Sequence, residues 1–125
     1  MQNKIRILIL EETASDGDLM EFELMEAGFN FITKRTQTEK EFLLALKDFS
    51  PDLILSDYDL PQYTGALALV AAKAKFPDVS FIIVIDELDK DIDIIEEILA
   101  KGASDCILKY HLDRLPSAIR KALVL

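Results

Sequence analysis

Short, nearly continuous apolar runs alternate with longer segments in which apolar residues recur every three or four positions along this 125-residue chain. Three of the short runs, at residues 5–10, 53–56 and 81–85, are rich in Ile, Leu and Val. Runs of this kind are typical of strands that are buried on both faces of a parallel sheet. Two weaker runs, at 29–34 and 106–108, predict a more peripheral strand and a short last strand.

The periodic segments predict helices between and after these strands. The expected helices cover residues 16–27, 38–49, a segment after Gly65, a segment before Gly102 and residues 112–123. We expect Ser15 or Asp16 to cap the first helix. In the helix before Gly102, the spacing of Ile92, Ile95 and Leu99 predicts that these side chains point inward. Strict alternation of strands and helices predicts one α/β domain, in which helices cover both faces of a parallel sheet through right-handed crossovers.

Composition narrows the classes of function. The formal charge is −9, with 23 acidic against 14 basic residues, which disfavours non-specific binding to nucleic acid and favours a cation or a basic partner. The apolar runs are too short to span a bilayer, and the N-terminus leads directly into a strand pattern, so we expect no membrane insertion and no signal peptide. Cys106 and His111 are the only Cys and His residues, too few for an internal disulfide or a zinc site. A reducing cytoplasm is the expected location.

Charged side chains follow the predicted strands at the points where those strands end. They are Glu11 and Glu12 after the first strand, Asp57 and Asp59 after the third, Asp86 after the fourth and Lys109 after the fifth. Functional sites in parallel α/β sheets lie beyond the carboxyl ends of the strands, so we expect these groups to converge. Carboxylates suit a hard cation such as Mg²⁺, and a carboxylate can act as the nucleophile in aspartyl-phosphate chemistry. Lys109 is suited to pair with Asp57 and with a phosphoryl oxygen.

Each of these features has a simpler explanation when it is taken alone. The acidic pair Glu11 and Glu12 would be favourable next to a helix N-terminus, and Asp57 would serve as a turn residue. Lys109 would be a solvated lysine or the structural partner of a carboxylate. The functional interpretation rests on their joint occurrence after the central strands of one predicted sheet.

The chain resembles, over essentially its whole length, the receiver domain of response regulators in two-component signalling. The resemblance is carried by ILILEE at residues 7–12, PDLILSDYDLP at 51–61 with Gly65, and KGASD at 101–105 with Lys109. The ending LDRLP at 112–116 looks like receivers attached to sensor kinases and photoreceptors. The resemblance implies a single receiver domain over residues 1–125 with a flavodoxin-like (βα)5 fold. It also implies the sheet order 2-1-3-4-5, for which a chemotaxis receiver is a standard example.

The resemblance also implies roles for the residues at the strand ends. Asp57 would accept a phosphoryl group from a phosphohistidine of a histidine kinase or phosphotransfer protein. Glu12, assisted by Glu11, would hold Mg²⁺ or Mn²⁺ together with Asp57 and the backbone carbonyl of Asp59, and Lys109 would contact the phosphoryl group. A downstream protein would dock on the fourth and fifth helices. The domain would not be an enzyme beyond self-catalysed phosphoryl transfer and dephosphorylation.

Three departures from the family pattern fall mainly on the switching residues. Glu12 is one methylene longer than the usual Asp. The end of the fourth strand, where the family has Ser or Thr, holds Ile85, or Asp86 if the register slips by one residue. The segment 86–93 is also longer than usual, and Cys106 replaces the aromatic switch residue of the fifth strand. Two interpretations therefore stay open: a phosphorylated receiver with altered signalling, or a degenerate receiver that acts as a phosphorylation-independent docking module.

An enzyme interpretation is the third alternative. The sequence Asp57-Tyr58-Asp59 after an apolar strand matches the Asp-x-Asp motif of haloacid-dehalogenase-type phosphatases, in which the first Asp is the nucleophile and the second the acid/base. That motif normally continues with Gly-Thr, whereas this chain continues with Leu60-Pro61, and those enzymes need a longer chain. A flavin-binding interpretation is weaker, because no Ser/Thr/Gly-rich phosphate loop follows the first strand.

Overall fold

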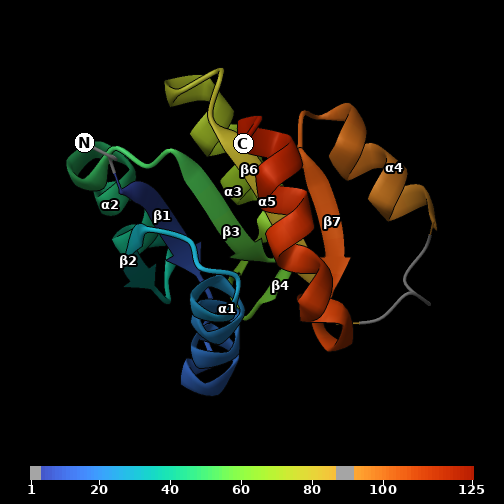
Figure 1. Cartoon of the computed structure of the whole chain (residues 1–125). Helices are drawn as coiled ribbons and strands as arrows, with labels where there is room; N and C mark the ends of the chain where they lie inside the picture. Colours follow the sequence, from blue (N-terminus) through green and yellow to red (C-terminus); the bar gives the residue numbers. More distant parts are fainter. Residues whose placement is uncertain (1–3, 87–91) are drawn as a thin grey trace.

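The computed structural model describes residues 4–86 and 92–125, in which five parallel strands form one sheet (Figure 1). The strands are β1 (Ile5–Leu10), β2 (Phe31–Thr36), β3 (Leu53–Asp57), β6 (Ser80–Ile85) and β7 (Asp105–Leu108). Their order across the sheet is β2-β1-β3-β6-β7, and every neighbouring pair is parallel. The predicted order 2-1-3-4-5 is confirmed, because β6 and β7 are the fourth and fifth strands of this sheet along the chain.

Helices cover both faces of the sheet (Figure 1). One face is covered by α1 (Ala14–Glu26) and α5 (Leu115–Leu123), which directly follows the 3-10 helix η1 (Lys109–Arg114). The opposite face is covered by α2 (Glu39–Phe49), α3 (Gly65–Lys75) and α4 (Ile92–Ala100). The flavodoxin-like three-layer architecture is therefore confirmed.

Strand β1 shows why the apolar runs are continuous. Ile7 and Ile9 pack into the core beneath α1 and α5, whereas Leu8 and Leu10 pack into the core beneath α2 and α3. All four side chains are completely buried. A strand with a core on each side needs apolar residues at every position. The two apolar cores, one on each face of the sheet, fix the central strands in place. They thereby also fix the positions of the residues at the ends of those strands.

Two boundaries near the N-terminus differ from the predicted ones. Helix α1 begins at Ala14 with Thr13 at its N-cap, so the prediction that Ser15 or Asp16 caps it is wrong. Asp16 lies inside the first turn, and its carboxylate binds another residue, Lys109. Strand β2 covers Phe31–Thr36 instead of 29–34, because it pairs with β1 along the full length of both strands.

The predicted inward face of α4 is wrong for Ile92 and Leu99, whereas Ile95 is partly buried. Ile98 is the buried residue at 2% exposure, whereas Ile92 and Leu99 are 69% and 43% exposed. Helix α4 packs against β7, which is an edge strand of the sheet, and a helix at an edge can bury only a narrow stripe. The periodicity shows that α4 is amphipathic, but Ile and Leu occupy too much of its circumference to show which side faces the core.

A short antiparallel pair of strands, β4 (Asp59–Leu60) and β5 (Tyr63–Thr64), follows β3 and was not predicted. It closes the loop after Asp57 before α3 begins at Gly65. In the described part of the chain, no helix has the length and apolar character needed to cross a membrane.

Candidate functional site

The ammonium group of Lys109 lies among four carboxylates at the carboxyl edge of the sheet. Its Nζ atom is 3.1 Å from Glu11 Oε1, 3.1 Å from Asp16 Oδ2, 3.3 Å from Asp57 Oδ2 and 3.6 Å from Asp86 Oδ1. The contacts with Asp16 and Asp57 are hydrogen bonds that Lys109 donates. We call these five residues the Lys109 cluster. One largely buried ammonium thus serves as the counter-ion for an excess of negative charge.

The topology of the sheet brings this cluster together. Glu11 follows β1, Asp57 is the last residue of β3, Asp86 follows β6 and Lys109 follows β7. Because these parallel strands are neighbours in the sheet, their carboxyl ends meet along one edge. The predicted convergence of Glu11, Asp57, Asp86 and Lys109 is therefore found in the structure.

Asp57 is buried, with only 4% of the residue exposed. Its Oδ1 atom accepts a hydrogen bond from the backbone N–H of Asp59 at 3.3 Å, and its Oδ2 atom accepts the one from Lys109. Burial raises the pKa of Asp57 from 3.8 to about 6, and the neighbouring Glu11 carboxylate adds to that rise. The charge of Lys109 opposes it, so the carboxyl stays mostly ionised at neutral pH.

The pKa of Lys109 depends on two opposing effects, burial and the neighbouring carboxylates. Burial lowers the pKa of its ammonium, but the hydrogen bond to Asp16 and the charges of Asp57 and Glu11 outweigh that effect. The pKa of Lys109 is consequently held above its ordinary value of 10.5. Lys109 therefore remains a cation over the whole physiological pH range.

Glu11 carries the least satisfied polar atom in the described part of the chain. Its Oε2 atom accepts a hydrogen bond from the backbone N–H of Thr13 at 3.1 Å. Its Oε1 atom is buried and accepts no hydrogen bond there, although Lys109 Nζ lies 3.1 Å away as an ion pair. Lys109 compensates the charge of this oxygen, whose lone pairs remain available to a cation.

This donor chemistry fits a hard divalent cation, because the cluster presents carboxylate oxygens and includes an under-coordinated one. The ligands are not pre-assembled: among the described residues, no three Asp, Glu, His or Cys side chains are arranged as a metal site. Lys109 Nζ occupies the space between the carboxylates and supplies the positive charge that they require.

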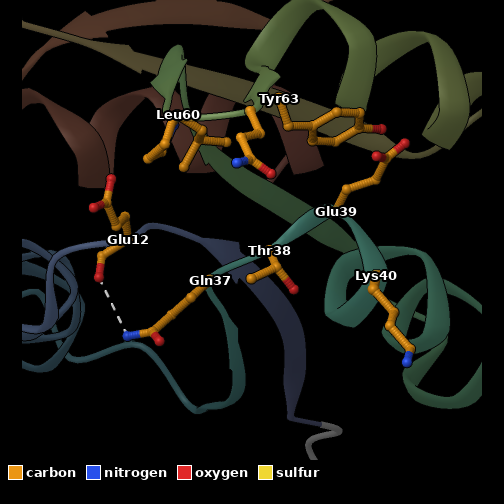
Figure 2. A pocket seen from close by; sticks show the side chains of 9 residues that line it. Glu12, Gln37, Thr38, Glu39, Lys40, Leu60 and Tyr63 are labelled. Atoms are coloured by element: carbon orange, nitrogen blue, oxygen red, sulfur yellow. Dashed lines mark hydrogen bonds between the residues drawn. The ribbon is translucent and has the colours of Figure 1, made fainter.

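Glu12 lies outside the Lys109 cluster. It is exposed and lines a hollow of about 480 Å³ between the start of α2 and the β4–β5 hairpin. Its backbone carbonyl accepts a hydrogen bond from Gln37 Nε2 at 3.2 Å. Figure 2 shows the Glu12 carboxylate pointing away from that hydrogen bond. The structure thus places Glu12 beside the site without joining it to the other acids.

Gly65 fixes the loop that follows Asp57. A Cβ atom at this position would lie 2.8 Å from the Asp57 carbonyl oxygen and 2.9 Å from Tyr58 Cα. The Gly65 N–H donates a hydrogen bond to the Tyr58 carbonyl at 2.9 Å. Only glycine permits this approach, and the approach brings the start of α3 against the end of β3.

The predicted switch positions have distinct environments. Ile85 is the last residue of β6 and is 1% exposed, whereas the side chain of Asp86 is 54% exposed and faces Lys109. Neither residue provides a hydroxyl group. Cys106 is partly buried, and burial with the nearby Asp105 raises the pKa of its thiol to about 11. The predicted lengthening of segment 86–93 lies mostly outside the described residues.

Asp16 is the member of the cluster that sequence reasoning missed. We expected it only as a helix cap, yet the N-cap is Thr13, and the Asp16 carboxylate accepts a hydrogen bond from Lys109. The available signal was its position one turn after the Glu11–Glu12 pair. The packing of α1 against η1, which brings that turn to Lys109, is visible only in the folded chain.

Comparison with known proteins shows the family of the chain. The family model of the response regulator receiver domain matches residues 7–120. Regulatory protein LuxO of Vibrio vulnificus (strain YJ016) is 36% identical over 119 residues, which cover 91% of this chain and 25% of that protein. Chemotaxis protein CheY of Bacillus subtilis (strain 168) is 29% identical over 119 residues, which cover 94% of this chain and 97% of that protein. The chain thus spans about a quarter of the length of the LuxO proteins.

Solved structures show the same fold. The signal receiver domain of a putative LuxO repressor protein from Vibrio parahaemolyticus has a TM-score of 0.86 at 22% identity, covering 98% of this chain and 92% of that one. Chemotaxis response regulator CheY4 of Vibrio cholerae has a TM-score of 0.82 at 18% identity, covering 97% and 100%. With the family match over nearly the whole chain, the conclusion is that this chain belongs to the response regulator receiver domain family.

Proposed function

We propose that Asp57 accepts a phosphoryl group from a phosphohistidine on a histidine kinase or phosphotransfer protein. Receiver domains interact with such proteins and are generally signalling domains without enzymatic activity. The observation that carries the proposal is the buried Asp57 carboxylate, hydrogen-bonded to Lys109 at the carboxyl edge of the sheet. A nucleophilic carboxylate beside a fixed cation is suited to attack an electron-poor phosphorus.

The transfer forms one bond and breaks another. A carboxylate oxygen of Asp57 attacks the phosphorus atom, and the P–N bond to the donor imidazole breaks. The bonding electron pair returns to the imidazole nitrogen, and the product is an acyl phosphate on Asp57. Lys109 remains charged and can donate a hydrogen bond to a phosphoryl oxygen, which stabilises the added negative charge.

Receiver domains typically bind Mg²⁺ at the phosphorylation site. In this chain we assign the ion, Mg²⁺ or Mn²⁺, to Glu11, Glu12, Asp57 and the backbone carbonyl of Asp59. The buried Glu11 Oε1 atom, which accepts no hydrogen bond from the described residues, supports the assignment. When bound, such an ion neutralises carboxylate and phosphoryl charge. Glu12 directly follows Glu11 in the sequence, and its exposed side chain would have to turn toward the cluster to complete the ligand set.

The output surface that we propose is the side of the domain formed by α4 and α5. Ile92 and Leu99 of α4 are exposed apolar side chains, a feature that supports docking of a downstream protein there. Receiver domains link to downstream output domains in general.

A constitutive docking module is the second candidate function. It is favoured by the residues at the end of β6, where Ile85 is buried and Asp86 presents a negative charge to the site. Without a Ser or Thr hydroxyl at this position, a phosphoryl group on Asp57 would lack a hydrogen-bond donor that the family usually provides. The family match to a receiver domain disfavours the phosphatase alternative.

The test is labelling with acetyl phosphate and Mg²⁺, followed by intact-mass measurement of the wild type, Asp57→Asn and Asp59→Asn. We expect one acid- and base-labile phosphoryl adduct on the wild type and none on Asp57→Asn. Asp59→Asn should still be labelled, because its proposed contribution comes from backbone atoms. A wild type that stays unlabelled under conditions that label an ordinary receiver would favour the docking module.

A further inference from the structure

Asp16 contacts Lys109 as closely as any carboxylate in the cluster. The Lys109 Nζ to Asp16 Oδ2 distance is 3.1 Å, against 3.3 Å to Asp57 Oδ2. Asp16 comes from the first turn of α1, and its side chain is 31% exposed. The residue has no part in the phosphoacceptor chemistry proposed above, so its bond to Lys109 needs an explanation.

The number of protons on the ammonium limits what Lys109 can do. A lysine ammonium has three donor hydrogens. Lys109 donates two of these, to Asp16 and Asp57, and Glu11 Oε1 at 3.1 Å and Asp86 Oδ1 at 3.6 Å lie beside it as ion pairs. A phosphoryl group on Asp57 would therefore meet a cation that has two of its three donors engaged and further carboxylates close to it.

The carboxylate partners of Lys109 differ in how easily they can lose their contact with it. Glu11 and Asp57 are buried, with side-chain exposures of 2% and 5%, so loss of their contact with Lys109 would leave a buried charge uncompensated. Asp16 is partly exposed, and water can take the place of Lys109. Asp16 is thus the partner that most readily gives way to a new anion.

We propose that Asp16 competes with the phosphoryl group for Lys109 and so limits phosphorylation of Asp57. This inference rests on the proposed phosphoacceptor function. In the unphosphorylated domain Asp16 holds one ammonium donor, and the phosphoryl group must displace Asp16 to gain that donor.

The competing explanation is that Asp16 only stabilises the N-terminus of α1 through the helix dipole. Asp18 provides a matched control, because it lies two residues further along the same helix and carries the same charge. Its carboxylate is 71% exposed and pairs with Arg35 at 2.7 Å instead of Lys109. A dipole or net-charge effect would appear in Asp16→Asn and Asp18→Asn alike.

The experiment compares the full chain as wild type, Asp16→Asn and Asp18→Asn. The first readout is the initial rate of labelling by acetyl phosphate with saturating Mg²⁺. The second is the hydrogen exchange of the Lys109 ammonium protons, observed by proton–nitrogen NMR without a phosphodonor. We expect Asp16→Asn to be labelled roughly two- to fivefold faster than Asp18→Asn, the effect of a partly exposed pair. Exchange at Lys109 should quicken in Asp16→Asn only.

The outcomes separate the two proposals. A labelled wild type with Asp16→Asn no faster than Asp18→Asn contradicts the competition while leaving the phosphoacceptor function intact. Unchanged Lys109 exchange in Asp16→Asn contradicts it as well. An unlabelled wild type with a labelled Asp16→Asn supports the competition in its strongest form. If none of the three proteins is labelled, the phosphoacceptor function fails, and the competition fails with it.

Discussion

Lys109 donates a hydrogen bond of 3.3 Å to Asp57 Oδ2, and this bond joins the ends of two strands that are not neighbours. Asp57 ends β3, Lys109 follows β7, and β6 lies between those strands in the sheet. The side chain of Lys109 therefore reaches past the end of β6, where Asp86 faces it. The same bond balances charge in the folded domain and holds the proposed nucleophile beside a cation.

Removal of the Lys109 ammonium should destabilise the fold strongly. In Lys109→Ala the buried carboxylates of Glu11 and Asp57 lose their shared counter-ion, and we expect a loss of about 3–5 kcal/mol in the free energy of unfolding. Lys101→Ala is the control, because its pair with Glu97 is exposed and spans one helical turn. It should cost about 0.3–0.5 kcal/mol. Equal losses in urea denaturation of the two variants would show that the cluster does not carry the charge balance described above.

Asp57→Asn should stabilise the metal-free domain at neutral pH. Burial raises the pKa of Asp57 from 3.8 to about 6, so the folded state binds a proton more readily than the unfolded chain between these values. The stability from this carboxyl is therefore fully present below about pH 4 and is lost as pH rises through about 6. Asn does not titrate. The expected gain at pH 7 is on the order of 1–3 kcal/mol.

The pH dependence is the control for that prediction. The difference in unfolding free energy between Asp57→Asn and the wild type should be smallest near pH 4 and grow up to pH 7, measured by urea denaturation in the presence of a metal chelator. Lys109 stays charged across this window and adds no titration of its own. A difference that is independent of pH would mean that burial of the Asp57 carboxylate is not its cause.

Gly65 and Gly17 should respond in opposite directions to the same change. In Gly65→Ala the new Cβ would lie 2.8 Å from a backbone oxygen, so the loop after Asp57 must shift, and we expect a loss of about 1–3 kcal/mol. In Gly17→Ala the nearest atoms, at 3.2 Å, belong to the end of the Arg35 side chain, which is paired with Asp18 and Glu21 and needs to shift by only a few tenths of an ångström. Alanine also favours the helix by up to about 1 kcal/mol. Thermal unfolding of both variants tests the contrast, and a neutral Gly65→Ala would contradict the close approach.

Mg²⁺ at millimolar concentration should raise the unfolding temperature, because ligand that binds only the folded state stabilises it. Glu12→Gln should weaken this effect, since the proposed ligand set loses one carboxylate. Glu39→Gln is the matched control, because Glu39 lines the same hollow as Glu12 but is not a proposed ligand. A shift that is absent in the wild type, or equal in Glu12→Gln and the wild type, would remove the metal assignment from Glu12.

The sequence predicted the strands and the sheet edge well because β1, β3 and β6 are buried on both sides, and continuous apolar runs encode that burial directly. The meeting of Glu11, Asp57 and Lys109 then follows from the parallel topology. Features that depend on packing at the periphery were not predictable in this way. The face of α4 that carries Ile98 is set by contact with an edge strand, which leaves no distinctive pattern in the sequence.

Asp16 and Glu12 illustrate the same limit at the site itself. Both are acids near the end of β1, and local sequence gives no sign that one binds Lys109 and the other lines a neighbouring hollow. The distinction comes from the first turn of α1, which begins at Ala14, and from the packing of that turn against η1. The residue types indicated the chemistry of the site, whereas helix packing determines which of the acidic residues contact Lys109.

Localisation of the phosphoryl group by tandem mass spectrometry tests the proposed role of Asp57 most directly. The protein is incubated with acetyl phosphate and Mg²⁺, the acyl phosphate is trapped by borohydride reduction, and the peptides are sequenced. We predict modification at residue 57 alone in the wild type and none in Asp57→Asn. Modification at another carboxylate that persists in Asp57→Asn, or no modification when an ordinary receiver is fully labelled, would contradict the assignment of Asp57 as the phosphoacceptor.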